Sequence, residues 1–159
     1  RFVASRTSVR GALFFPISNT ETAVRQTEEG GTRMRFEKLH HVAMIVSDYQ
    51  RAREFYVEKL GFPILRENFR EERGDWKLDL KFGDGELEIF AIPGAPPRPT
   101  YPEAQGLRHL AFRVEDIEEA VRELEALGIP CEEIRWDPYS EKRMTFFHDP
   151  DGLPLELHE

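Results

Sequence analysis

Two histidine–glutamate pairs with the same spacing are the residues of this sequence best suited to chemistry. His41 and Glu88 lie 47 positions apart, and the same 47 positions separate His109 from Glu156. Two imidazoles and two carboxylates on one surface form a nitrogen and oxygen donor set that suits a divalent transition metal with open coordination positions. Burying the carboxylates beside the histidines without a cation would be costly. The spacing therefore indicates either a metal centre or an open, solvated face.

The two pairs belong to an internal repeat. The segment LHHVAMIVSD at 39–48 aligns with LRHLAFRVED at 107–116, and such a repeat has to be recognised before the fold is assigned. Each copy continues into a helical pattern that ends at a glycine, and then into strand-like segments, which in the second copy are GIPCEEI, RMTFF and PLELH. We therefore expect an α+β protein with two tandem βαβββ modules, forming a concave, partly open mixed sheet with the helices on the outside.

Composition sets the expected boundaries of these modules. We expect the first module at residues 36–92 and the second at 105–159, joined by a proline-rich linker at 93–104. Residues 1–33 lack the alternating and helical patterns, so we expect them to be an extension, disordered or non-native.

Alternation along the strands separates candidate site residues from the core. Because the residues at 42, 44 and 46 form an apolar face, His41 is expected on the opposite face, with His40 pointing away from it. The side chains that we expect to bind substrate on the site face are Arg113, Lys77, Arg143 and Phe90. The cationic groups among them would suit an anionic substrate. For Arg113, ion pairing across the sheet is an equally good interpretation. Other side chains expected on this face are Glu86, Asp79, Thr145 and His158, with Trp76, Tyr139 and Phe147 as candidate pocket walls.

Charge and composition exclude several classes of function. The 159 residues carry a net charge of -8, which argues against a nucleic-acid partner. The sequence contains no apolar run near the roughly 20 residues that span a bilayer, so we expect no membrane partner. The single cysteine, Cys131, fits a reducing compartment. We expect a cytoplasmic protein that binds a small molecule.

The repeat, the two histidines and two glutamates, and the closing DPDGLPLEL at 149–157 resemble the vicinal oxygen chelate superfamily. That group contains glyoxalase I, bleomycin-resistance proteins and extradiol dioxygenases. The resemblance covers residues 36–159. Three segments look most like the YaeR-like, glyoxalase-related bacterial branch, which has no assigned substrate: REERGDWKLDL, PPRPTYPEAQGLRHLAFRVED and DPYSEKRMTFFHDPDGLPLELHE.

By resemblance to glyoxalase I, His41, Glu88, His109 and Glu156 fall on its four metal-ligand positions. The resemblance implies a metal-dependent lyase or isomerase that acts on a small oxygen-chelating substrate through an enediolate-type intermediate. Glu156 would be the base and Glu88 its partner on the other side. The metal would be zinc or nickel, with manganese, cobalt or iron as alternatives. The family also implies a homodimer, in which one site lies within a chain or is shared between chains.

Two other functions remain open from the sequence. A non-haem iron(II) dioxygenase of the same fold would need His41, His109 and Glu156 but not Glu88. A small-molecule or antibiotic-binding resistance protein would use the cleft without this chemistry. The matched pairs favour the lyase or isomerase.

Overall fold

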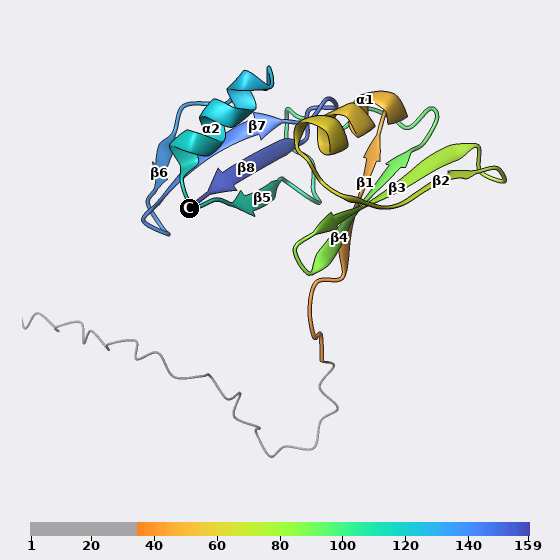
Figure 1. Cartoon of the computed structure of the whole chain (residues 1–159), viewed down its shortest axis with the longest axis horizontal. Helices are drawn as coiled ribbons and strands as arrows, with labels where there is room; N and C mark the ends of the chain where they lie inside the picture. Colours follow the sequence, from red (N-terminus) through yellow and green to blue (C-terminus); the bar gives the residue numbers. More distant parts are fainter. Residues whose placement is uncertain (1–34) are drawn as a thin grey trace, which may run out of the picture. The chain divides into compact units, whose positions relative to one another are not determined.

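The first sheet contains the first half of the repeat (Figure 1). The structure, a computed structural model, describes residues 35–159, so the expectations for residues 1–33 lie outside the described residues. The strand order is β1-β4-β3-β2, with β1 parallel to β4 and the other neighbours antiparallel. The strands are β1 (His41–Val46), β2 (Ile64–Arg70), β3 (Asp75–Phe82) and β4 (Gly85–Ala91).

The second sheet repeats this topology as β5-β8-β7-β6, again with its first pair parallel. Its strands are β5 (Leu110–Arg113), β6 (Arg135–Asp137), β7 (Lys142–His148) and β8 (Pro154–His158). Two mixed four-stranded sheets with few helices confirm the expected α+β fold class. Within the described residues, none of the helices combines the length and the apolar character needed to cross a membrane.

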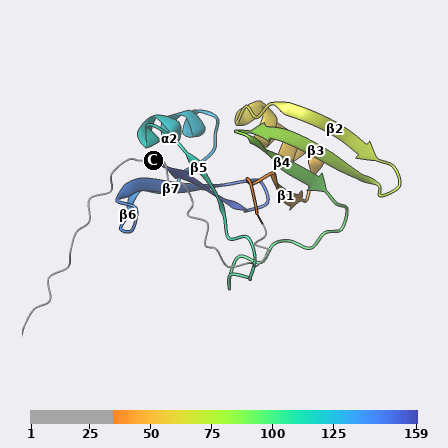
Figure 2. The same ribbon diagram turned by 90° about the horizontal axis from the view of Figure 1, so that it is seen from below.

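Each sheet has helical structure on one face, as Figures 1 and 2 show. In the first half, α1 (Tyr49–Arg53) runs directly into the π-helical segment η1 (Glu54–Lys59), and in the second half α2 (Ile117–Ala126) covers the sheet. Both helical segments begin after an aspartate that caps them. The Asp48 carboxylate accepts a 2.8 Å hydrogen bond from the Arg51 backbone N–H, and Asp116 accepts one of 3.0 Å from Glu119. Gly128 follows α2 with φ of 74°, a left-handed conformation that glycine adopts without strain.

The apolar faces of the strands pack under the helices. Met44 and Val46 are buried, at 7% and 2% exposed. The alternate residues Ala43 and Ile45 are exposed on the other face. The same alternation buries Leu87 and Ile89 in β4. The face opposite the helices is therefore left for polar side chains, as expected.

One predicted strand is wrong. GIPCEEI at 128–134 forms no strand, and the strand that pairs with β7 begins only at Arg135. Pro130 removes one backbone N–H from this segment, and only Glu132 reaches across, donating its N–H to the Phe146 carbonyl at 2.8 Å. The segment instead connects α2 to a short edge strand.

The two halves contact each other through α1, η1 and the turn between β7 and β8. Tyr56 donates a 2.9 Å hydrogen bond to the buried Asp149 carboxylate, and the Ser47 backbone N–H donates one of 2.8 Å to Asp151. The rings of Phe55 and Phe147 lie 6.5 Å apart in the core. The chain segment DPDG thus joins the second half to the first.

Candidate metal centre

The first histidine–glutamate pair is assembled by the parallel pairing of β1 with β4. His41 opens β1, and Glu88 lies in β4 opposite Ala43. Since residues at alternate positions share a face, both side chains project away from the helix. His41 Nε2 lies 3.7 Å from Glu88 Oε2, and the His41 side chain is 43% exposed.

The second pair is closer and more buried. His109 directly precedes β5, and its Nε2 lies 3.0 Å from Oε2 of Glu156 in β8. Glu156 is 7% exposed. The edge of the His109 imidazole meets the Phe146 ring at a centroid distance of 5.4 Å, which limits the orientation of the imidazole. A buried carboxylate facing an imidazole nitrogen is a geometry that a bound cation would stabilise.

The donor atoms of each pair fit a shared divalent ion. Metal bonds to histidine nitrogen and carboxylate oxygen are about 2.0–2.2 Å long, so two ligands at tetrahedral angles are roughly 3.4 Å apart. The distances of 3.7 Å for His41 with Glu88 and 3.0 Å for His109 with Glu156 lie on either side of this value. Each pair could therefore supply half of a four-ligand centre.

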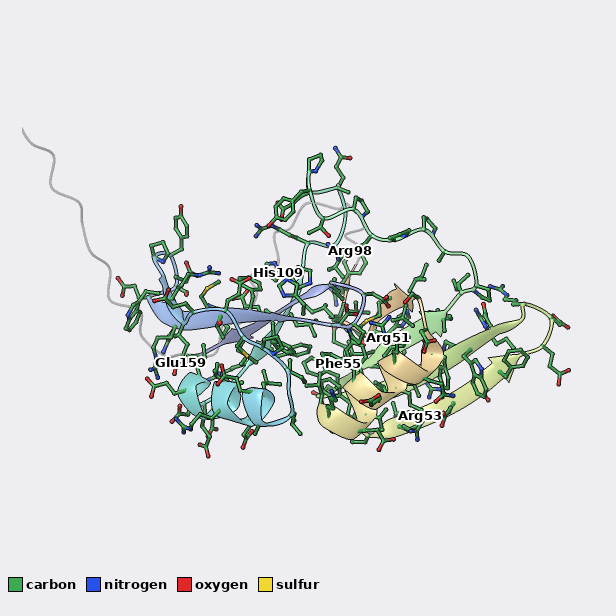
Figure 3. The ribbon with its side chains drawn as sticks, turned by 90° about the horizontal axis from the view of Figure 1, so that it is seen from above. Arg51, Arg53, Phe55, Arg98, His109 and Glu159 are labelled. Carbon is green, nitrogen blue, oxygen red and sulfur yellow. The ribbon has the colours of Figure 1, made fainter. Side chains whose placement is uncertain are left out.

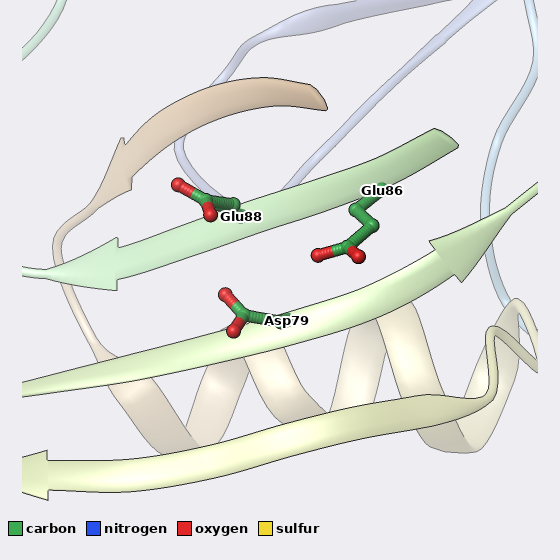
Figure 4. A group of neighbouring side chains, drawn as sticks. All are labelled: Asp79, Glu86 and Glu88. Carbon is green, nitrogen blue, oxygen red and sulfur yellow. The ribbon is translucent and has the colours of Figure 1, made fainter. Parts of the chain in front are cut away.

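Within residues 35–159, the structure does not gather these four side chains into one cluster. The one group of three or more ligand-type side chains found there is Asp79, Glu86 and Glu88, whose carboxylates converge on the sheet face opposite the helix (Figure 4). The two pairs belong to separate sheets. We call each pair a half-site, after the half of a four-ligand centre that it could supply.

The acidic cluster is already paired with basic side chains. Lys77 Nζ lies 2.8 Å from Glu88 and 2.9 Å from Asp79, and Arg66 bonds both Asp79 and Glu86. Burial alone would raise the pKa of the Asp79 carboxyl, but its hydrogen bonds to Lys77 and Arg66 outweigh burial and lower it. Burial likewise opposes the charge of Lys77, yet its two carboxylate partners raise its pKa. This cluster is an ion-pair network beside the first half-site.

Of the expected substrate-binding residues, two lie on the site face of the first sheet. Lys77 pairs in register with Phe90, two residues beyond Glu88 in β4. Lys77 Nζ lies 5.5 Å from the centroid of the Phe90 ring, and the Arg70 guanidinium lies 4.8 Å from the same centroid. The aromatic ring is therefore flanked by two cations close to the first half-site.

The expected positions of Arg143 and Thr145 are wrong. In the β7–β8 register, Thr145 pairs with the core residue Leu157, whereas Phe146 pairs with Glu156. Arg143 accordingly lies on the helix side, where it binds Glu159 at 2.6 Å and Glu118 of α2 at 2.9 Å. In β7 the side chains of Arg143 and Thr145 therefore face the helix, whereas we expected them on the site face.

Arg113 keeps the expected face of β5, since it pairs with His158, two residues beyond Glu156 in β8. It lines an apolar groove of about 310 Å³ rather than the cavity beside His109, and its contact with substrate stays a prediction.

The three side chains expected as pocket walls lie elsewhere. Phe147 is 2% exposed in the core and Tyr139 is 96% exposed, so neither walls a pocket on the site face. Trp76 lies in the helix-side core layer, stacked on Tyr49 at a centroid distance of 4.5 Å.

His40 also departs from the alternation rule. It precedes the first residue of β1, and its Nδ1 lies 2.9 Å from Nδ1 of His41, with the two rings edge to face. The expectation that His40 points away from His41 is wrong, because strand alternation begins only at His41. This contact leaves Nε2 of His41 turned to Glu88.

Comparison with known proteins assigns the family. The model of the Glyoxalase/Bleomycin resistance protein/Dioxygenase superfamily matches residues 38–157. The chain belongs to this superfamily. It is 54% identical over 127 residues to YwkD of Bacillus subtilis (strain 168), covering 79% of this chain and 99% of YwkD. It is 52% identical to YaeR of Escherichia coli (strain K12), covering 77% and 96% of the two chains. The structure of a glyoxalase family protein from Enterococcus faecalis is 60% identical, with a TM-score of 0.76 over 79% of this chain and all of that one.

More distant superfamily relatives have names of enzymes. A 2-epi-5-epi-valiolone epimerase from Actinomyces sp is 32% identical over 142 residues, covering 75% of this chain and 77% of the epimerase. Glyoxylase I 4 of Arabidopsis thaliana is 27% identical, and glutathione transferase FosA of Serratia marcescens is 29% identical. The superfamily relatives therefore span several reactions.

One feature of this superfamily member escaped the sequence analysis. A cavity of about 230 Å³ opens beside His109 and is lined in part by Arg98 of the proline-rich segment. The only sequence signal was an arginine between two prolines, at 97–99. Strand alternation carries no information about such a connecting segment, so the residue was not identified.

Proposed function

We propose that this protein is a divalent-metal-dependent lyase or isomerase of the glyoxalase type, acting on a small substrate that offers two adjacent oxygens. The observation that carries the proposal is the pair of half-sites, each with a histidine Nε2 facing a glutamate Oε2. His41, Glu88, His109 and Glu156 would hold the ion. The relatives named as an epimerase and a glyoxylase support chemistry of this kind.

The ion, when bound, would supply Lewis-acid stabilisation of charge that develops on the two substrate oxygens. Glu156 would take a proton from a substrate carbon next to a carbonyl and return it to the neighbouring carbon, through an enediolate-type intermediate. Its 7% exposure keeps bulk water from competing for that proton. Lys77, 2.8 Å from Glu88, would hold that carboxylate in place on the opposite side.

A complete centre would be shared between two copies of this chain. The first half-site of one copy would face the second half-site of another, because each half-site supplies one histidine and one glutamate of the four ligands. Ile45, on the same face of β1 as His41, is 58% exposed, and an apolar side chain on that face favours a covering partner. We therefore propose a homodimer with two shared sites.

The first experiment is metal analysis of protein purified without chelator or histidine tag, by inductively coupled plasma mass spectrometry. About one divalent ion per chain is expected, with zinc or nickel first among the candidates, and Glu88→Ala should lose it. The exposed Glu133→Gln variant is the matched control. Protein without metal, and with none taken up on titration, would contradict the proposal and favour a metal-free binding protein.

A mixing experiment tests the sharing of the site. One variant carries His41→Ala and Glu88→Ala, and the other carries His109→Ala and Glu156→Ala, so neither alone has an intact set. In mixed dimers a shared arrangement regenerates one complete site of two, and metal binding returns. If the site lies within one chain, the mixture binds no more metal than the separate variants do.

The dioxygenase alternative gives a different result in the same variants. It requires iron held by His41, His109 and Glu156 alone. Retention of iron by Glu88→Ala would favour the oxygenase, whereas loss of the ion supports the four-ligand centre.

A further inference from the structure

A polar cavity lies directly beside the second half-site. It measures about 230 Å³ and is lined by residues from the proline-rich segment, from the chain just before β5 and from β7, among them Arg98, Arg108, His109 and Phe146. Figure 3 shows Arg98 and His109 on the same side of the second sheet, next to each other. A ligand in this cavity would contact both the half-site and the segment that covers it.

The basic side chains of the cavity differ in how their charge is balanced. Arg108 is paired with Glu103 at 2.8 Å, and Arg135 with Glu132 at 3.1 Å. Arg98 has no acidic partner among the residues that the structure describes. Its Nη2 donates a 3.3 Å hydrogen bond to the Arg108 carbonyl, and its Nε is buried without a protein acceptor among the described residues. One cavity cation is thus left uncompensated.

A buried guanidinium donor without a partner is costly, because the group has lost water and gained no acceptor. A planar oxyanion would satisfy it, since Nε and the terminal nitrogens of arginine match two oxygens of a carboxylate or phosphoryl group. The buried Nε therefore points to an anionic ligand rather than to an apolar one.

The sequence around Arg98 restricts its backbone. Pro97 and Pro99 flank it, and a residue that precedes proline is confined to extended conformations. The backbone that carries this guanidinium therefore loses little conformational freedom when a ligand binds. The segment is thus suited to present one side chain to a fixed position.

We propose that Arg98 binds an anionic group of the substrate, a carboxylate or phosphoryl group, while the substrate's oxygen pair lies at the His109–Glu156 half-site. This assignment of the substrate class rests on the proposed function. The cavity is smaller than the about 300–1,000 Å³ of sites for drug-sized ligands. The part of the substrate that enters this cavity is therefore small and carries an anionic group.

The test uses the full chain as apoprotein, treated with EDTA and then dialysed free of it, because the carboxylates of EDTA would compete with the probe. Inorganic phosphate and acetate are titrated separately by isothermal calorimetry, and the probe that binds identifies which of the two anions the cavity takes. Arg98→Gln should weaken binding about tenfold or more, as expected for the loss of a charged hydrogen bond. Arg98→Lys keeps the charge but loses the paired donors of the guanidinium. Its anion affinity should lie between those of the wild type and Arg98→Gln. Arg122→Gln, on the exposed surface of α2, should bind as the wild type does.

The outcomes separate this inference from the proposed function. Arg98-dependent anion binding, together with no metal in the analysis of protein purified without chelator, supports the anion site and contradicts the metal enzyme. Metal binding with no anion binding, or with equal affinity in Arg98→Gln, overturns the anion site and leaves the metal centre standing. A change in oligomeric state in Arg98→Gln without a change in anion affinity also overturns it, because the arginine then serves a contact between copies.

Discussion

The hydroxyl of Tyr56 in η1 donates a 2.9 Å hydrogen bond to the carboxylate of Asp149 in the turn between β7 and β8. Tyr56 is fully buried and Asp149 is 6% exposed. Burial raises the pKa of the Asp149 carboxyl. Hydrogen bonds from the Leu153 backbone N–H and the Tyr56 hydroxyl lower this pKa but do not outweigh burial. This contact joins the two repeats inside the core, so it couples the folding of one half to the other.

Tyr56→Phe should therefore destabilise the protein by about 1–3 kcal/mol, because it leaves a buried carboxylate without its hydroxyl donor. Chemical denaturation followed by circular dichroism measures this. Tyr139→Phe is the matched control, since Tyr139 is 96% exposed. Equal stability of the two variants would show that the Tyr56 hydroxyl does not hold the halves together.

A second prediction concerns acid stability. Arg70 makes two 2.6 Å hydrogen bonds to Asp75, and these lower the pKa of the Asp75 carboxyl against the opposing effect of burial. A lowered native pKa means that the unfolded chain binds more protons, so this stabilisation is present above about pH 4 and is lost as the pH falls further. Arg70→Gln should flatten the loss of unfolding free energy between about pH 5 and pH 2.

Denaturation curves at intervals across this pH range give the slope for the wild type and for Arg70→Gln. Arg122→Gln removes a positive charge from the exposed face of α2 and should keep the wild-type slope. If Arg70→Gln and the wild type lose stability in parallel, the ion pair does not set the acid response.

Strand alternation predicted the faces of the first sheet because β1, β3 and β4 follow one another in a regular register. His41, Glu88 and Lys77 lie on one face as the sequence indicates. The same rule failed for Arg143, because a single-residue error in the assumed sense of a strand moves every side chain to the other face. Only the pairing of β7 with β8 decides which face each side chain of β7 takes. This pairing depends on contacts between distant parts of the sequence.

The remaining errors have similar causes. His40 lies before β1 begins, where alternation does not hold, and its ring contacts His41. Arg98 lies in a connecting segment, whose path depends on tertiary packing rather than on periodicity. The equal spacing of the two histidine–glutamate pairs identified side chains that lie close together within each pair. One ion held by all four stays a prediction.

A third prediction separates the two adjacent histidines. His41 faces Glu88 through Nε2 and contacts His40 through Nδ1, so His40 would act on the ion only by orienting the His41 ring. His41→Ala should reduce bound metal to the background level, whereas His40→Ala should weaken metal affinity only about tenfold. Metal titration of both variants decides this. Equal and complete loss in the two would mean that His40 is itself a ligand.

The fourth prediction concerns Glu156 as the base. Glu156→Gln keeps the size of the side chain and an oxygen donor but cannot accept a proton, so the fold and part of the metal binding should persist. Turnover of a substrate found by screening 2-oxoaldehyde adducts should fall by about 10²–10⁴-fold, the usual contribution of a positioned base. Steady-state kinetics, with metal content measured on the same samples, separates loss of the base from loss of the ion. Glu133→Gln, at an exposed position, should retain full activity. Full activity in Glu156→Gln at normal metal content would assign the proton transfer to another group, and Glu88 would be the next residue to substitute.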